Sequence, residues 1–141
     1  MTAGEEGLIQ LYAKALRLPT VADCAAIVRE ATQQRWGYEE FLRAVLQREL
    51  EQRQDNQRKR RVKAARFSQI KTLDAFDFGW LKHVEEAQVY ELATGRFIEA
   101  KQPVLMFGNP GTGKTHLALA LAYQVCQLGY TTRFYTAGEL V

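Results

Sequence analysis

The chain has 141 residues, 47% hydrophobic and 25% charged, which is the composition of a globular protein and excludes a disordered one. This length allows one ordinary domain, or a small domain with part of a second. The net charge of +3 is mild, so the placement of the basic residues is more informative than their total. No apolar run has the length of a membrane span, and residues 1–6 lack the basic start of a signal peptide, so we expect a cytoplasmic protein without a membrane partner.

Three helices are predicted before residue 67. Apolar residues at helical spacing place the first at about 7–18, and Pro19 is expected to stop it. Thr20 has the residue type of an N-cap for the second helix, which fades near Gln34. The third helix begins at Tyr38 and continues to about residue 66. Its apolar stripe, which we expect to pack on the first two helices, consists of Tyr38, Phe41, Leu42, Val45, Leu46 and Leu50.

The second half of the third helix is polar on all sides and carries the densest charge in the chain. Composition alone leaves a solvated helix and a nucleic-acid contact equally open. No aromatic residue interrupts the run, so contact with the backbone of duplex DNA is a better interpretation than base stacking. The candidate DNA-binding residues are Arg53, Arg58, Lys59, Arg60, Arg61, Lys63 and Arg66.

The pattern changes after residue 66. Residues 67–78 lose the helical period and predict an extended linker that docks through its aromatic side chains. We therefore predict a helical domain at 1–66, a linker at 67–78 and a second domain at 79–141. A helix ending at Thr94-Gly95 follows, and His83 is interpreted as a surface or half-buried histidine. The cysteines, Cys24 and Cys126, lack metal-ligand spacing and are predicted to be reduced and packed.

One stretch near the C-terminal end matches the phosphate-binding pattern G-x-x-x-x-G-K-[ST]. An apolar run at 103–107, predicted to be a strand, leads into it, and an Ala- and Leu-rich helix pattern follows at 116–126. In such a loop the backbone N–H groups and the helix N-terminus attract phosphate, the lysine reaches the β- and γ-phosphates, and the Thr115 hydroxyl can ligate Mg²⁺. The loop comprises Gly108, Asn109, Pro110, Gly111, Thr112, Gly113, Lys114 and Thr115. A second strand is predicted at 131–135.

The order of these features resembles the IstB-type transposition helpers, ATP-binding proteins of the AAA+ group that also contains the helicase loader DnaC. The resemblance covers essentially the whole chain. It rests on the three-helix N-terminal part, the end of the basic helix at 60–67, the linker at 71–78, the segment 91–98 and the loop from Gly108 to His116.

The resemblance implies an all-α N-terminal domain followed by the first part of a P-loop α/β domain, truncated after its second strand. It implies ATP and Mg²⁺ as cofactors. It also implies duplex DNA, a cognate transposase and further copies of the protein as partners. It carries over the loop residues through His116, and it places Phe76 or Phe78 against the adenine.

Members of that family continue past the equivalent of Val141 with residues that position water and neutralise charge. The nearby carboxylates here, Asp74, Asp77 and Glu139, do not end a buried strand, so we assign no catalytic residue and expect ATP binding without hydrolysis. The resemblance also implies that strands absent from this chain separate 103–107 from 131–135. We therefore expect both to be left unpaired and 79–141 to be marginal alone.

Two other functions remain open from the sequence. A helicase loader of the same ATPase group would share the glycine loop, although the first nine residues look too short for a helicase-contacting extension. A module that binds DNA and assembles without nucleotide, acting through residues 1–66, is the third hypothesis. It predicts duplex affinity that survives Lys114→Ala and falls when the basic residues are replaced.

Overall fold

The computed structural model describes residues 3–81 and 84–141, and His83 lies outside them. The chain divides into two compact units, Met1–Gln57 and Arg58–Val141. Within the described ranges, no helix combines the length and the apolar character needed to cross a bilayer.

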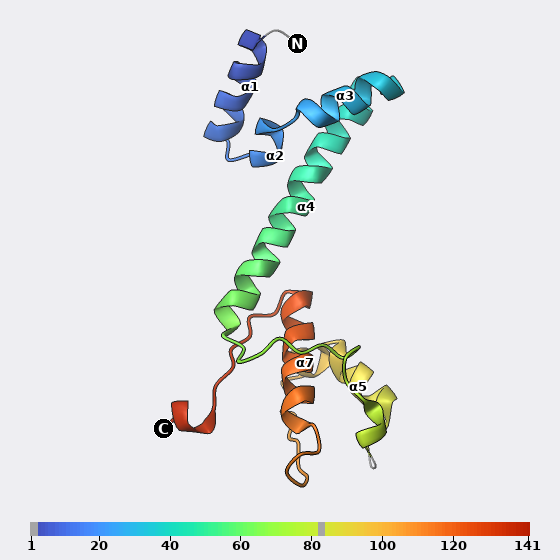
Figure 1. Cartoon of the computed structure of the whole chain (residues 1–141), viewed down its shortest axis with the longest axis vertical. Helices are drawn as coiled ribbons and strands as arrows, with labels where there is room; N and C mark the ends of the chain where they lie inside the picture. Colours follow the sequence, from blue (N-terminus) through green and yellow to red (C-terminus); the bar gives the residue numbers. More distant parts are fainter. Residues whose placement is uncertain (1–2, 82–83) are drawn as a thin grey trace. The chain divides into compact units, whose positions relative to one another are not determined.

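The N-terminal unit is helical, and its helices differ in part from the prediction. Its second predicted helix is divided by a turn at 23–24 into two helices. Pro19 does more than end the first helix: it occupies the first turn of the next one, where its missing N–H is tolerated. Thr20 is not an N-cap, because Leu18 holds that position without a side-chain bond. The helices are α1 (Ala3–Ala15), α2 (Pro19–Ala22), α3 (Ala25–Gln34) and α4 (Tyr38–Ala65), and Figure 1 shows α1 packed beside α2.

Helix α4 confirms the long third helix, but the predicted packing of its apolar stripe is wrong. Phe41 and Val45 are half-buried, whereas Tyr38 is 96% exposed and the three leucines of the stripe are also exposed. Length does not explain this exposure, because the stripe at 38–50 and α1 both have 13 residues, about 20 Å of helix. Helix α1 packs on α2 instead of on the stripe.

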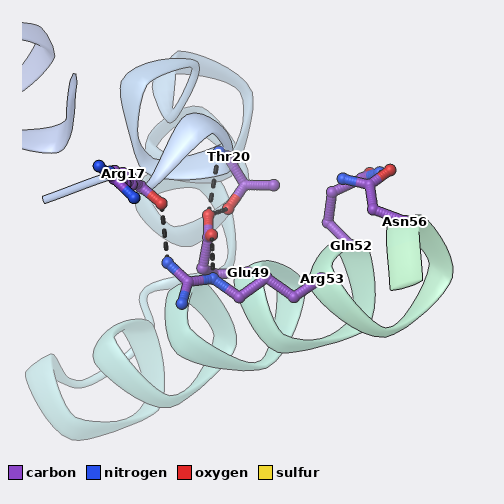
Figure 2. Close-up of polar contacts among 6 residues, drawn as sticks. All are labelled: Arg17, Thr20, Glu49, Gln52, Arg53 and Asn56. Carbon is purple, nitrogen blue, oxygen red and sulfur yellow. Dashed lines mark hydrogen bonds and ion pairs between the residues drawn. The ribbon is translucent and has the colours of Figure 1, made fainter. Parts of the chain in front are cut away.

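A polar cluster joins α2 to α4 inside the N-terminal unit (Figure 2). Glu49 on α4 is only 4% exposed, and its carboxylate accepts hydrogen bonds from the backbone N–H and the hydroxyl of Thr20. Arg53, one turn further along α4, donates to the same carboxylate at 2.8 Å and to the carbonyl oxygen of Arg17 at 2.7 Å. Glu49 thus satisfies an N–H in the first turn of α2, which the residues at that helix start leave without a cap.

The C-terminal unit is built around α7 (Lys114–Leu128). The linker and α5 pack against one face of α7, and α5 also packs on α6. The core that they share consists of Leu73, Phe76, Val89, Ala93, Leu117, Ala120 and Leu121. Linker docking through an aromatic residue is thereby confirmed. The other elements of this unit are η1 (Phe78–Trp80), α5 (Glu86–Ala93), α6 (Arg96–Glu99) and η2 (Ala137–Glu139).

The described residues contain no β-strand, so the structure does not confirm the α/β assignment. Residues 103–107 and 131–135, the two predicted strands, are non-helical but form no ladder. Among the described residues, the backbone of 131–135 makes one hydrogen bond with a distant segment, from the Phe134 N–H to the Ala65 carbonyl at 2.9 Å. A strand exists only when a neighbour pairs with it, and neither segment has such a neighbour in the part of the chain described.

Candidate nucleotide-binding site

The glycine loop at 108–113 leads directly into the N-terminus of α7, as the motif requires (Figure 1). Gly113 is the N-cap of α7 with φ +83°, and Gly111 has φ +79°. Residues with a side chain rarely adopt this left-handed backbone conformation, which explains why glycine occupies both positions. At Gly113 there is a second reason, because a Cβ would lie 3.0 Å from Cε2 of Phe76.

Lys114 folds back over the loop instead of extending into solvent. Its ammonium donates to the carbonyl oxygens of Gly108 at 2.8 Å and Asn109 at 2.6 Å, and it lies 3.3 Å from the Thr112 hydroxyl. That hydroxyl in turn donates to the Asn109 carbonyl at 2.8 Å. The loop therefore holds a positive charge at the start of α7, where the helix dipole adds to it. This is an arrangement suited to a phosphate chain.

The chemistry of the site fits a magnesium ion only when a phosphate group supplies part of its coordination. Thr115 follows the lysine and is exposed, so its hydroxyl is accessible as one ligand. No group of three or more His, Cys, Asp or Glu side chains that could hold a metal exists among the described residues. Magnesium commonly takes few protein ligands and completes its coordination with phosphate oxygens and water. Thr115 would hold the ion, which would neutralise phosphate charge.

An aromatic cluster borders the loop on its packed side. Phe76 contacts Gly113, and its ring meets the rings of His116 and Phe78 edge-on, each with centroids 5.2 Å apart. Phe78 also stacks on Tyr90 at 5.8 Å. Phe76 is buried, so Phe78, which is half-buried beside the 45% exposed Tyr90, retains the more accessible ring. Adenine contact by either phenylalanine stays a prediction.

Two residues of this cluster carry information that sequence reasoning did not use. The sequence does not predict a role for Tyr90, because a tyrosine within the α5 pattern gives no signal of a partner 12 residues earlier. It predicts His116 only as part of the loop, yet Nε2 of His116 is buried without a hydrogen-bond partner within the described part of the chain. Only the folded linker brings these side chains to the loop.

The nearby carboxylates have local roles or are solvent-exposed. Asp77 caps η1 by accepting from the Gly79 N–H at 2.9 Å, and Asp74 is exposed. Glu139 accepts from the N–H and the hydroxyl of Thr136, and these bonds lower the pKa of its carboxyl. Both bonds lie at the start of η2. None of the three lies at the end of a strand.

The seven basic residues proposed for DNA contact have different environments. Arg53 is held by Glu49 and Arg17, and Nε of Arg61 donates to the Cys126 carbonyl at 3.3 Å. Lys59 and Lys63 are exposed and four residues apart, so they lie on one side of α4. Only Arg61 of these seven is half-buried, and Arg66, with φ +54°, lies just beyond the helix.

Both cysteines are free and buried, as predicted. Burial raises the pKa of the Cys126 thiol, against an opposing effect of the Arg61 charge. A thiol in that state is a poor nucleophile and a poor metal ligand.

The family model for the IstB-like ATP-binding protein matches residues 11–141. The chain belongs to the IstB-like ATP-binding protein family. This confirms the resemblance read from the residues, and the glycine loop lies inside the matched range.

Individual relatives agree with the IstB-like assignment. The chain is 36% identical over 134 residues to the predicted ATP-binding protein of insertion sequence IS5376 from Geobacillus stearothermophilus, covering 94% of this chain and 53% of that protein. It is 34% identical over 116 residues to the predicted IS21 ATP-binding protein of Pseudomonas aeruginosa, covering 82% and 44%. A predicted insertion-sequence ATP-binding protein of Sinorhizobium fredii is 32% identical over 139 residues, covering 97% and 47%. The chain thus spans about half the length of these curated relatives.

Proposed function

We propose that this chain binds ATP with Mg²⁺ at the loop 108–115 and acts in insertion-sequence transposition, by assembling on duplex DNA and presenting the target to a transposase. The observation that carries the ATP assignment is the Lys114 ammonium held by the loop carbonyls at the start of α7, in a chain of the IstB-like family. Binding without hydrolysis is part of the proposal, because no described carboxylate is placed to orient water.

The nucleotide proposal is tested by a thermal melt of the 141-residue chain with and without Mg-ATP. A ligand that binds only the folded state raises the free energy of unfolding by about 2.7 kcal/mol when its concentration is a hundred times Kd. We therefore expect Mg-ATP to raise the melting temperature by several degrees. Lys114→Ala should abolish the shift. Lys101→Ala removes the same charge from an exposed position outside the loop and should leave it intact. No shift in the parent would refute ATP binding, and phosphate release by the parent would refute the absence of hydrolysis.

For DNA we propose the exposed side of α4 that carries Lys59, Arg60 and Lys63. All three are exposed, and their spacing places the side chains within reach of one phosphate backbone. Replacing all three with alanine should weaken duplex binding and reduce the slope of log K against log salt by about 0.9 for each lost contact. The matched control replaces the exposed cations Lys14, Arg29 and Arg43, which changes net charge equally. If both triple variants lose the same duplex affinity, the loss comes from the net charge and not from this side of α4, and the proposal is refuted.

The domain organisation also stays a proposal. We propose that 1–66 is the more self-sufficient part, that 67–78 links it to 79–141, and that 79–141 is marginal alone and becomes an α/β domain once its two extended segments are paired. Limited proteolysis tests this organisation. If the linker stays docked through Phe76, it should be cut late. If 79–141 unfolds in solution, the linker loses that packing and should be cut early.

A further inference from the structure

The end of α4 bonds to the last turn of α7 inside the Arg58–Val141 unit. Nε of Arg61 donates to the carbonyl oxygen of Cys126 at 3.3 Å, and Arg61 is half-buried. One turn later Ala65 is completely buried, and its carbonyl oxygen accepts from the Phe134 N–H at 2.9 Å. The basic end of α4 is thereby attached to the unit that carries the glycine loop.

Arg61 lies at the C-terminal end of α7. The Cys126 carbonyl is one of the last four in that helix, which have no N–H donor inside it, and the helix dipole favours a cation there. The same helix begins at Lys114 in the glycine loop. Because α7 has 15 residues and is about 22 Å long, Arg61 and Lys114 act on opposite ends of one rigid element.

The linker provides a second connection between the two ends of α7. Just beyond α4, the Phe67 ring meets the Tyr123 ring edge-on, with centroids 6.3 Å apart. Further along the linker, Phe76 contacts Gly113 at the start of α7. The linker thus runs along α7 from its C-terminal half to the glycine loop. Packed side chains and rigid helices of this kind can carry energetic coupling between separate sites.

The lysines proposed for DNA contact lie on the opposite side of α4 from Arg61. Lys59 and Lys63 are each two residues from Arg61, which is about 200° around a helix, and both are exposed. Arg61 therefore faces α7, while the two lysines face away from it. A phosphate backbone that contacts the lysines would lie across the helix from the guanidinium.

We propose that Arg61 is a positioning residue and not a DNA contact. By bonding to the last turn of α7, it fixes the cationic side of α4 to the helix that starts at the glycine loop. Nucleotide that orders the start of α7 then favours the docked state of the α4 end over a released state. DNA that binds Lys59 and Lys63 favours the same state, because a fixed helix end loses less freedom on binding.

Two consequences follow for the ligands. Since coupling between two sites is reciprocal, ATP and duplex DNA should each strengthen the binding of the other. The coupling should depend on the Arg61 bond, although Arg61 touches neither ligand. The inference rests on the proposed function, because it presupposes that both ligands bind.

Two neutral substitutions isolate the hydrogen bond. Glutamine carries its amide nitrogen at the chain position of the arginine Nε, so Arg61→Gln keeps a donor there, whereas Arg61→Met has a similar length without one. Both variants lose the same charge. In the free chain, amide hydrogen exchange at the end of α4 should accelerate about five-fold in Arg61→Met and stay near the parent rate in Arg61→Gln. Equal exchange in the two variants would show that the bond does not hold the α4 end, and would overturn the proposal.

The functional readout is the effect of Mg-ATP on duplex affinity, measured by titration of a labelled duplex. In the parent and in Arg61→Gln, saturating Mg-ATP should tighten duplex binding about five-fold or more, and in Arg61→Met this factor should fall toward one. A merely structural role would lower the melting temperature of Arg61→Met without changing the factor, which would contradict the proposal. If the parent binds neither ligand, the proposed function fails. If the parent binds both and Arg61→Met keeps the parent's factor, only this inference fails.

Arg60 supplies the matched control for direct contact. It is the neighbouring residue, is exposed and is proposed to contact phosphate. Arg60→Gln and Arg60→Met should therefore weaken duplex binding equally and reduce the slope of log K against log salt by about 0.9. Arg61→Gln should leave that slope unchanged. A slope that falls by about 0.9 in both Arg61 variants would make Arg61 a phosphate contact and would overturn the proposal.

Discussion

One face of α7 is closed and the other is open, although both are apolar. On the closed face, Leu117 and Ala120 pack against the linker and α5. On the open face, Ala118 and Ala122 border a groove beside 103–107. The partners of the closed face come from a contiguous stretch that folds by local helix formation and linker docking. The open face adjoins 103–107 and 130–133, which overlap the two predicted strands, and strand pairing requires neighbours from elsewhere in a chain.

The largest effect should come from the closed face. Phe76→Ala removes a buried ring from the shared core and should destabilise the Arg58–Val141 unit by about 3–5 kcal/mol. The control Phe107→Ala removes the same ring from an 88% exposed position and should change stability by less than about 0.5 kcal/mol. Exchange of α7 amides measures both. Equal destabilisation by the two variants would show that the Phe107 ring is as well packed as the Phe76 ring.

The same contrast applies in the N-terminal unit, where Glu49 is enclosed while most of the α4 stripe is exposed. Glu49→Gln leaves buried donors poorly paired and should cost about 1.5–3 kcal/mol in urea unfolding. Glu51→Gln, at an exposed position on the same helix, should cost little. If the two variants unfold alike, the Thr20–Glu49–Arg53 cluster does not hold α2 to α4.

The Glu49 cluster also predicts a pH dependence. Burial tends to raise the pKa of this carboxyl, but the hydrogen bonds from Thr20 and Arg53 together hold it below its ordinary value. A lowered folded-state pKa means that stability is fully present above the unfolded value of about 4.3 and is lost as pH falls through the folded value. Unfolding of the parent across the acid range should show this loss, and Glu49→Gln should flatten it.

A smaller effect should appear at the loop, where Gly111 and Gly113 share a left-handed φ but differ in surroundings. Alanine at either position should cost about 1–2 kcal/mol from the backbone alone. Only Gly113→Ala should cost more, because its Cβ meets Phe76, whereas nothing lies within 4 Å at Gly111. In a Phe76→Ala background the difference between the two should vanish, as unfolding of the double variants would reveal.

The smallest effect is expected on the open face. Met106→Ala should lower stability less than Leu117→Ala does, because Met106 is half-buried at the edge of the core whereas Leu117 is buried inside it and should cost about 2–5 kcal/mol. Thermal unfolding compares the two. A large loss from Met106→Ala in the chain alone would indicate that the groove is already filled.

The sequence by itself determined the features that depend on nearby residues. The glycine loop, α7 and the long α4 follow from motif, helix propensity and periodicity, and each of these acts within a few turns. The order of motifs also carried the family assignment, which the comparison confirmed.

Only the tertiary structure decided which of these surfaces are covered. The α4 stripe has the pattern of a buried face, yet α1 packs on α2 and the stripe stays largely exposed. The linker places Phe76 on Gly113 and His116, and Glu49 replaces Thr20 as the capping group of α2. The segment 103–107 has the composition of a strand but no partner in the described residues. The physical reason is the same in each case: a pattern specifies which face of an element is apolar or polar, whereas covering that face depends on residues far away in the sequence.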